Sequence, residues 1–399
     1  MNFLAIIVFL LMFMVLVSVH ELGHYLFARY FNMGVSEFSV GMGRPIVKTW
    51  ARRKYVTDEG EEQETLFNFR AWPLGGFVKI LGMEPDEDGN ESRVQGGFYS
   101  KAPWQRIVVL LAGPVFSLAF GWLILVGVFT FSGMDVPSNV VLDTVKDEPA
   151  FKAGIKSGDR VLSIDGHPIA NQQEGIKFIR ASNGKELTFK VQRAGKDMDI
   201  KVQPTLSADE RPSFDDDGVP NGQFKKQAQV GIMFGADKVY PGLISAMGEA
   251  TNFPIQQVQM MVKRITQPQQ IINNSTGVVG MAVITKEAVQ SGMSTVFLLT
   301  GMISISLGIF NLLPIGPLDG GQILLSLIEW IRRGRRVSVQ AQMKFFIAGI
   351  ALMGCLFVFR FYKDIVQFVI PGKENVLGRR EPSKAESNNT PAANNAPVK

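Results

Sequence analysis

Residues 20–24 read His-Glu-Leu-Gly-His, an H-E-x-x-H pattern that lies inside an apolar run. No charged residue occurs from Phe3 to Val19, and the run continues through the motif to Phe27. A segment of this length can cross a bilayer as a helix. It has no basic segment before it and no Ala-x-Ala-like site after it. We therefore expect a retained transmembrane helix rather than a cleaved signal peptide.

The motif itself predicts a metal site. Residues four apart share one face of a helix, so His20 and His24 can reach the same ion. Glu21 would lie about 100° further round the helix, within reach of a water at that ion. The alternative is a chance pattern of satisfied core histidines. An unpaired buried acid is costly in a membrane, so the functional interpretation is favoured.

Composition supports a membrane protein with a soluble part. Hydrophobic residues make up 46% of the 399, and the formal net charge is only +5. The chain has no basic block with interleaved aromatic residues, so we expect no nucleic-acid partner. Cys355 is the single cysteine, which excludes a disulfide within the chain.

Three further stretches predict membrane spans. Residues 107–131 carry no charge and open with Ala112-Gly113-Pro114, a kink or a close-packing point. Residues 293–331 are apolar but are broken by an Asn-Leu-Leu-Pro-Ile-Gly-Pro-Leu-Asp-Gly-Gly segment. Irregular backbone at membrane depth must be buried in protein or line a wet cavity. Residues 345–361 predict the fourth helix.

A compact soluble domain is expected between the second and third spans. Short alternating strands at residues 140–145, 160–164, 187–191 and 198–202 are separated by turn signals, with a helix at 172–182. The pattern resembles a PDZ domain, and it is carried by Pro149-Ala150, Ala153-Gly154, Gly158-Asp159-Arg160-Val161 and Ile164-Asp165-Gly166. We interpret His167, which follows the last turn, as a surface residue.

Two other regions have weaker patterns. Residues 65–72 alternate, with Phe67, Phe69 and Ala71 on one face, which predicts a strand in one or two β-hairpins against the membrane. Residues 207–229 are polar and read as a linker. Apolar residues then recur at helical spacing from Leu243 to Ile265, interrupted by Pro254. They predict amphipathic helices that lie on the membrane surface or pack against the soluble domain.

Orientation follows from positive charge. The arginines between residues 332 and 336 belong in the cytoplasm. Four crossings then place the PDZ-like domain outside, and His20, His24 and Asp319 in the cytoplasmic leaflet. We expect a multi-pass protein of the bacterial plasma (inner) membrane.

The expected fold class is a polytopic α-helical membrane protein with four transmembrane helices, a membrane-associated β-hairpin region and an extracytoplasmic α+β PDZ-like domain. The parts in chain order are spans at 1–30 and 106–132 around a cytoplasmic-side loop with the hairpin at 31–105, the PDZ-like domain at 133–206, a linker with amphipathic helices at 207–292, the broken span at 293–331, a basic loop at 332–344, the last span at 345–370 and a disordered tail at 371–399.

The third metal ligand follows by elimination. Catalytic zinc usually has three protein ligands. His167 lies in the external domain, and a carboxylate at matching depth is the remaining donor. Asp319 and Glu329 are the candidates. Asp319 is favoured because it lies in the broken span, whereas Glu329 adjoins the arginines and is expected to pair there.

Together, H-E-L-G-H, Gly75-Gly76-Phe77-Val78-Lys79, Ala112-Gly113-Pro114, the PDZ-like pattern and N-x-x-P…L-D-G-G resemble the site-2 protease family. The nearest match is the bacterial branch that cleaves anti-sigma factors (RseP-type). The resemblance implies Zn²⁺ at His20, His24 and Asp319 and Glu21 as catalytic acid/base. It also implies cleavage of single-span membrane proteins, such as anti-sigma factors or signal-peptide remnants, within the bilayer. Ser117, Ser306 and Pro317 depart from common family patterns, which bears on substrate contacts.

Substrate contacts are expected at Asn311, Pro314, Phe67 and Phe69, with residues 65–72 as an edge strand that pairs with an unwound substrate. A peptide or chain end could bind the PDZ-like domain. Two other functions use the same features: a zinc-binding transporter or sensor, and a membrane-anchored PDZ adaptor. The former does not need Glu21 as a base, and the latter leaves Glu21 and Asp319 without a role.

Overall fold

The computed structural model describes residues 3–56, 62–83, 94–207, 211–214, 220–265 and 278–368. The expected tail at 371–399 lies outside these residues. The chain divides into two compact units: residues 1–122 with 257–399, and residues 123–256. Helix α2 begins in the first unit and ends in the second, and helix α5 runs from the second into the first.

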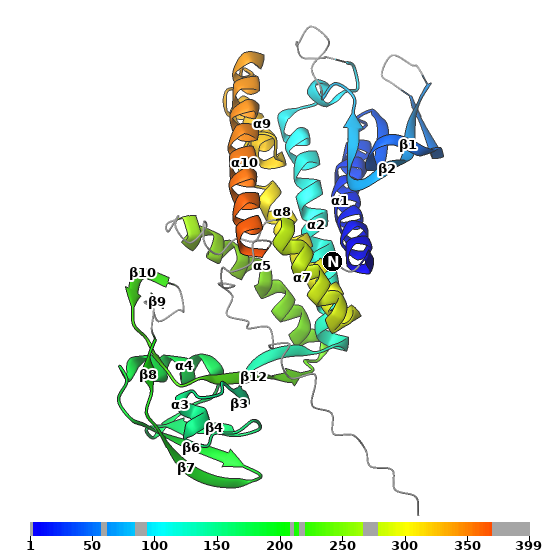
Figure 1. The fold of residues 1–399 in the computed structure, drawn as a ribbon. Helices are drawn as coiled ribbons and strands as arrows, with labels where there is room; N and C mark the ends of the chain where they lie inside the picture. The colour runs from blue at the N-terminus through cyan, green and yellow to red at the C-terminus, as the bar shows by residue number, and fades with distance from the viewer. Residues whose placement is uncertain are drawn as a thin grey trace, which may run out of the picture. The chain divides into compact units, whose positions relative to one another are not determined.

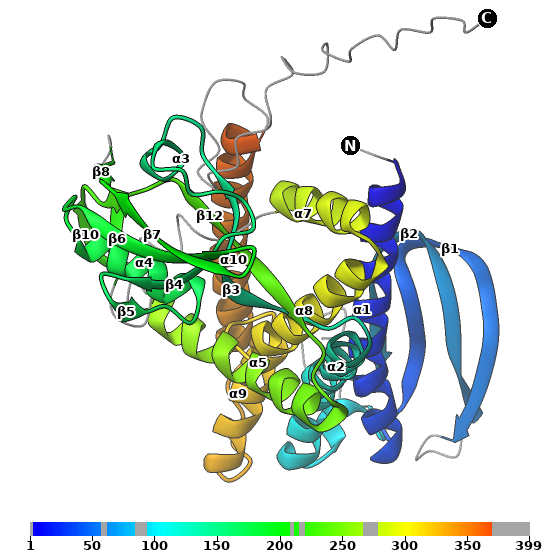
Figure 2. The same cartoon turned by 90° about the horizontal axis from the view of Figure 1, so that it is seen from below.

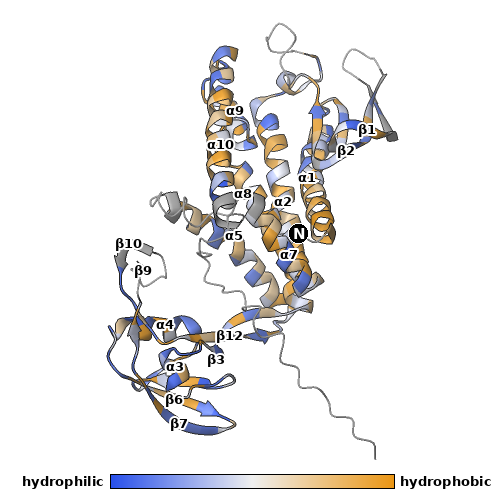
Figure 3. Cartoon of the chain, in the orientation of Figure 1, coloured by the Kyte–Doolittle hydropathy of each residue, from blue (hydrophilic) through white to orange (hydrophobic). Residues whose placement is uncertain are grey.

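Four helices of the described residues are long and apolar enough to cross a membrane. They are α1 (Phe3–Tyr30), α2 (Pro103–Phe131), α8 (Met293–Asn311) and α10 (Val339–Phe368). They stand side by side in the first unit (Figure 1), and Figure 3 shows them as the most hydrophobic part of the chain. Each predicted span coincides with one of these apolar helices, with boundaries moved by a few residues.

Among the described residues outside the PDZ-like domain, four further helices lie between these spans in the sequence. They are η1 (Phe98–Ser100), α5 (Leu243–Ile265, with Pro254 inside it), α7 (Val278–Ser291) and α9 (Asp319–Ile331). The break in the third span is confirmed, because α8 ends at Asn311 and α9 begins at Asp319. Helix α7 falls inside the predicted linker region and was not expected as a separate apolar helix.

Strands β1 (Val35–Val56) and β2 (Glu62–Ile80) form the predicted hairpin, which lies along α1 in both views (Figures 1 and 2). Both strands are bent, so each contributes two segments. Residues 35–40 pair with residues 76–80 and also with residues 66–69, and the latter pair in turn with residues 47–52. The prediction of an edge strand at 65–72 is therefore wrong for residues 66–69, which have neighbours on both sides.

A cluster of apolar side chains joins this sheet to the helices. Most of its buried members, such as Tyr25, Phe38 and Leu110, come from α1, β1, β2 and α2. The Phe67 ring packs at its edge, with its centroid 5.5 Å from that of Tyr25 and 5.6 Å from that of Phe38. The sheet is therefore fixed against the helix that carries the H-E-x-x-H motif.

The second unit contains the expected α+β domain. Its six-stranded antiparallel sheet has the order β12-β3-β4-β6-β7, with β5 beside β4. The strands are β3 (Met134–Thr144), β4 (Arg160–Ile164), β5 (His167–Pro168), β6 (Leu187–Arg193), β7 (Lys196–Val202) and β12 (Ile232–Val239), and the helices are α3 (Pro149–Lys152) and α4 (Gln172–Ala181). His167 is exposed as predicted, and its ring stacks on Phe178.

The predicted boundary at residue 206 and the linker at 207–229 are wrong. Short strands β8 (Thr205–Leu206) and β11 (Ala228–Gln229) pair with each other, as do β9 (Arg211–Phe214) and β10 (Pro220–Lys225). Strand β12 then pairs with β3, from Met134 opposite Val239 to Thr144 opposite Ile232. The domain closes with a strand that follows its first strand by almost 100 positions, a pairing that local composition does not reveal.

Candidate metal site

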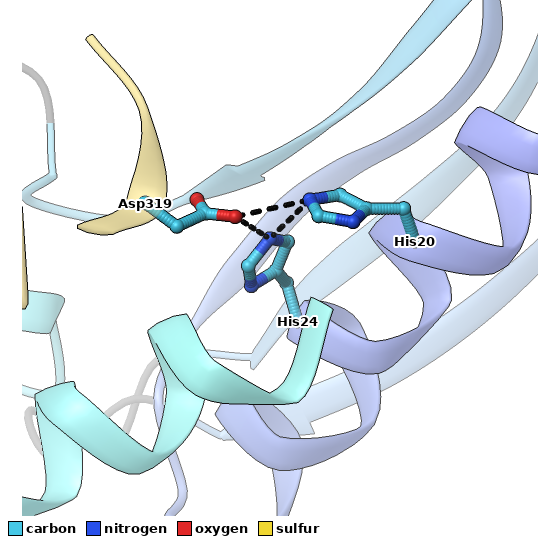
Figure 4. Close-up of side chains that lie close together, drawn as sticks. All are labelled: His20, His24 and Asp319. Carbon is cyan, nitrogen blue, oxygen red and sulfur yellow. Dashed lines mark hydrogen bonds and ion pairs between the residues drawn. The ribbon is translucent and has the colours of Figure 1, made fainter. Parts of the chain in front are cut away.

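Helix α1 directs both motif histidines to one point, where Asp319 meets them from the start of α9 (Figure 4). His20 Nε2 lies 3.0 Å from Asp319 Oδ2, and His24 Nε2 lies 3.4 Å from the same oxygen. The two Nε2 atoms are 3.2 Å apart. Both histidines are buried, at 6% and 8% exposure. Asp319 side-chain exposure is 14%.

Helix α2 orients the two imidazoles through contacts with their Nδ1 atoms. His24 Nδ1 donates to the carbonyl oxygen of Val109 at 2.9 Å. A carbonyl only accepts, so this bond leaves the Nε2 lone pair of neutral His24 free to bind a metal. His20 Nδ1 lies 3.0 Å from the hydroxyl oxygen of buried Ser117, whose backbone carbonyl accepts a bond from Ser304 Oγ at 2.7 Å.

Two glycines let α1 and α2 approach closely enough for these bonds. A Cβ at Gly23 would lie 2.4 Å from the carbonyl oxygen of Ala112. A Cβ at Gly113 would lie 2.2 Å from His24 Nε2 and 2.9 Å from His20 Nε2. The predicted close-packing point at residues 112–114 is thus the surface on which both histidine rings rest.

The position of Asp319 depends on the chain that precedes it. Residues 312–318 fold back over the first turn of α9, so a Cβ at Gly320 would lie 2.3 Å from the carbonyl oxygens of Leu312 and Leu313. A Cβ at Gly321 would lie 2.5 Å from the carbonyl oxygen of Ile315. The two glycines after Asp319 permit this tight reversal, which holds the carboxylate at the end of a helix rather than on a free loop.

The donor set fits zinc. Imidazole nitrogen and carboxylate oxygen are ordinary zinc ligands, with bonds of about 2.0–2.1 Å. In a tetrahedral site such bonds separate neighbouring donors by about 3.3 Å, and the three separations here are 3.0, 3.2 and 3.4 Å. The second nitrogen of each histidine is hydrogen-bonded, as is usual for zinc ligands. Among the described residues, these three form the one cluster with metal-binding geometry.

Glu21 and Glu329, the other two acids considered for the site, have different surroundings. The Glu21 carboxyl group lies beside the backbone of Val78 in β2, on the side of α1 that faces the sheet. Glu329 is paired with two arginines: its Oε2 is 2.7 Å from Arg106 Nη2, and its Oε1 is 3.1 Å from Arg336 Nε. The expected pairing of Glu329 with the basic loop is confirmed.

The predicted substrate contacts are more scattered. Asn311 is half-buried at the end of α8, and Pro314 is exposed in the 312–318 segment. Phe69 is 41% exposed, whereas Phe67 packs in the apolar cluster. The sheet edge nearest the motif is formed by residues 76–80, because Cβ at Gly76 would lie 3.7 Å from Val17 Cγ1 of α1.

Sequence reasoning missed the orienting groups. The backbone carbonyl of Val109 carries no residue-type signal at all. In the sequence, Ser117 stands out only as a departure from a family pattern, and Gly113 only as part of a close-packing point. The three-residue spacing from Ala112-Gly113-Pro114 to Ser117, one helical turn, was the available signal for a group on the same face of α2.

Comparison with known proteins agrees with this geometry. The sequence matches Peptidase family M50 over residues 8–356. A protein of Mesorhizobium japonicum named as a candidate zinc metalloprotease is 28% identical over 375 residues, covering 90% of this chain and 97% of that one. One of Clostridium perfringens with a similar name is 29% identical over 364 residues, covering 90% and 98%.

Among solved structures, the PDZ domain of an SdrC-like protein from Listeria monocytogenes matches with 20% identity, a TM-score of 0.18 and coverage of 25% of this chain and 90% of that one. The family match spans all three clustered side chains, and the relatives match over nearly their whole length. The chain therefore belongs to peptidase family M50, the site-2 protease family of zinc metalloproteases.

Proposed function

We propose that this zinc metalloprotease cleaves single-span membrane proteins inside their transmembrane segments, with His20, His24 and Asp319 as the metal ligands. The observation that carries the proposal is the convergence of two buried histidines, on a helix long enough to cross a membrane, with the carboxylate of Asp319 at the start of α9. A soluble substrate strand would have no route to donors at that depth, whereas a membrane segment is already there.

Bound zinc would supply a Lewis acid that polarises the scissile carbonyl and acidifies the attacking water. Glu21 takes the proton from that water and delivers it to the leaving amide nitrogen, which balances the hydrolysis. The Val109 carbonyl holds His24 in the tautomer that presents the Nε2 lone pair, and the Ser117 hydroxyl orients the His20 ring. The close packing of α2 on the histidines excludes bulk water from that side.

The substrate helix must unwind, because its carbonyls are engaged in its own hydrogen bonds. Asn311 would hold the unwound segment through its amide, and the exposed Pro314 and Phe69 are further candidate contacts. Since residues 66–69 have partners on both sides, we assign strand pairing with the substrate to the edge at 76–80. These residues lie against α1, beside Glu21.

Sidedness follows from charge. The arginines at 332–336 favour a cytoplasmic position for the loop between α9 and α10. The metal site then belongs to the cytoplasmic leaflet of the inner membrane, and the PDZ-like domain to the outer side. There the domain would admit only substrates that an earlier cleavage has shortened, either by size or by binding a new chain end.

The test compares three forms of the purified chain in lipid nanodiscs: wild type, Glu21→Gln and Asp319→Asn. We expect Glu21→Gln to keep its zinc and to lose at least about 10²-fold in cleavage of a single-span substrate, the usual lower range for loss of a general base. Asp319→Asn should lose both zinc and activity. Metal content by mass spectrometry and cleavage by gel assay report the two effects.

Zinc-loaded Glu21→Gln that cleaves at the wild-type rate would refute the base assignment. Asp319→Asn with full zinc occupancy would refute the ligand assignment. A zinc-loaded wild type that cleaves soluble unfolded chains but no single-span substrate would refute intramembrane cleavage.

A further inference from the structure

A second buried polar cluster lies away from the metal site, where α2, α9 and the loop before α10 meet. Arg106 of α2 is almost completely buried, at 1% exposure. Its Nη2 contacts Glu329 Oε2 at 2.7 Å, and the other carboxylate oxygen contacts Arg336 Nε at 3.1 Å. Both guanidinium groups also lie on the Tyr99 ring, at 5.4 and 5.1 Å from its centroid.

The cluster borders a cavity with a volume of about 20 Å³, enough for one oxygen-sized group. Its polar lining comes from the side chains of Arg106, Gln322, Ser326, Glu329, Arg336 and Gln342. The charged groups in this lining are two guanidiniums and one carboxylate, so the lining carries one formal positive charge. Arg106 Nε is buried and has no hydrogen-bond acceptor among the described residues.

A buried N–H donor without an acceptor is rare and costly. A guanidinium forms strong charge-assisted hydrogen bonds with phosphate oxygens. The lining therefore has one such donor and space for one oxygen acceptor, and its net positive charge favours an anionic one. The remaining side chains suit the same ligand, because Gln322 and Ser326 can donate to oxygen, whereas Gln342 Nε2 donates to the carbonyl oxygen of Val337 at 2.8 Å.

The surroundings indicate the source of that oxygen. Trp104 and Trp330 flank the cluster on α2 and α9 and are 46% and 55% exposed. Exposed tryptophans at the ends of membrane helices mark the headgroup level of a bilayer. Three more arginines, at 332, 333 and 335, are exposed on the adjoining loop. Basic pockets between helices at this level suit anionic lipid headgroups.

We propose that the cavity beside Arg106 binds a phosphate oxygen, supplied by an anionic phospholipid at the membrane surface. The phosphate would accept from Arg106 Nε and lie against Arg336, and the lipid chains would run along the outer surface of the helices. The site ties α2, which orients both histidines, to α9, which begins with Asp319.

The test uses the full chain in nanodiscs of phosphatidylcholine, with and without phosphatidylglycerol. Retained lipid is counted by native mass spectrometry, and thermal unfolding is followed in parallel. Arg336→Gln removes a cation of the cavity, and Arg335→Gln removes an exposed cation one residue away as the matched control. Both variants lose the general attraction of one cation for an anionic surface, and only Arg336→Gln also loses a contact in the cavity. We therefore expect Arg336→Gln to lower phosphatidylglycerol retention several-fold more than Arg335→Gln.

A second pair of variants keeps the test independent of Arg336. Gln342→Glu removes the bond from Gln342 Nε2 to the Val337 carbonyl but places a carboxylate beside two guanidiniums. We expect it, on balance, to raise the unfolding temperature in pure phosphatidylcholine and to remove the effect of phosphatidylglycerol. Gln340→Glu, on an exposed position of the same helix, should do neither. Inorganic phosphate is added to the phosphatidylcholine samples as a further arm.

If inorganic phosphate alone stabilises wild type but not Gln342→Glu, the site binds phosphate and the lipid is not its source. If neither phosphate nor phosphatidylglycerol distinguishes Arg336→Gln from Arg335→Gln, and Gln342→Glu gains no stability, water alone fills the cavity and the proposal is overturned. Zinc content and cleavage play no part in these readouts.

Discussion

Gly113 shows how much the metal site depends on a residue that offers no donor atom. A Cβ at this position would lie 2.2 Å from His24 Nε2, well inside van der Waals contact. We expect Gly113→Ala to displace the rings and to lower zinc affinity at least about ten-fold, the lower end for changes around a bound zinc.

The measurement is zinc titration of the metal-free protein, with helix content checked by circular dichroism. Gly127→Ala is the matched control, because it lies on the same helix and a Cβ there has nothing within 4 Å. Equal zinc affinity in Gly113→Ala and wild type would mean that the rings do not rest on this glycine when the metal is bound.

Ser117 carries a second residue-scale prediction. Its hydroxyl is the partner of His20 Nδ1, at 3.0 Å. Ser117→Ala should weaken zinc binding by about 10–100-fold, the usual effect of removing a partner of a ligating histidine. Ser306→Ala is the control, because that exposed hydroxyl bonds only within α8, to the carbonyl of Met302. Unchanged zinc affinity in Ser117→Ala would show that another group orients His20.

The sequence predicts an element well where the pattern lies within that element alone. The four spans, the break before Asp319 and strands β4, β6 and β7 follow from hydropathy and local periodicity. Alternation at residues 65–72 predicts a strand. A period of two shows which side chains share a face of the sheet, but it does not show which strands lie beside it. Nothing local shows that residues 66–69 lie between two other segments, or that β12 returns to pair with β3. The same limit applies to Ser117, which meets His20 across 97 positions.

The ion pair between Asp159, just before β4, and Arg193 of β6 predicts a pH dependence for the PDZ-like domain. Burial by itself would raise the pKa of Asp159, but its bonds to the Arg193 guanidinium and to the backbone N–H of Lys156 outweigh burial and lower it. The folded state thus binds the proton less readily than the unfolded state, whose carboxyl titrates near pH 4. This stabilisation is complete above pH about 4 and is lost as the pH falls through the lower folded pKa.

Hydrogen exchange of β4 and β6 amides in the intact chain measures this, after correction for the intrinsic exchange rate at each pH. We expect protection to fall below pH about 4 in wild type. Asp159→Asn should be less protected at neutral pH and flatter across the acid range. Asp197→Asn, in an exposed pair with Lys190, should behave as wild type. Identical pH profiles for wild type and Asp159→Asn would contradict the prediction.

The PDZ-like domain can be removed from the chain between its first and last strands, β3 and β12. Met134 and Val239 are opposite each other at the ends of β3 and β12, so the chain enters and leaves the domain at one place. Excision of residues 134–239 leaves ends that a short Gly-Ser linker can join. A deletion of 139–204 alone would cut β3 and leave residues 232–234 of β12 without their partners.

We expect the excised protein to keep its zinc and to cleave single-span substrates that still carry a bulky external domain, which wild type should reject. Gel assays with matched long and short substrates measure this. A zinc-loaded excised protein that cleaves neither substrate would show that the domain delivers substrates rather than filtering them.

The separation of the donors has a consequence for biogenesis. His20 and Asp319 are 299 positions apart, so the ribosome releases the two halves of the metal site at different times. At about 5–20 residues per second, the interval is on the order of 15–60 s. With the ligand set proposed above, a nascent chain without α9 holds only two of the three donors. We infer that such a chain has no complete zinc site, so the order of synthesis delays proteolysis until α9 has been made.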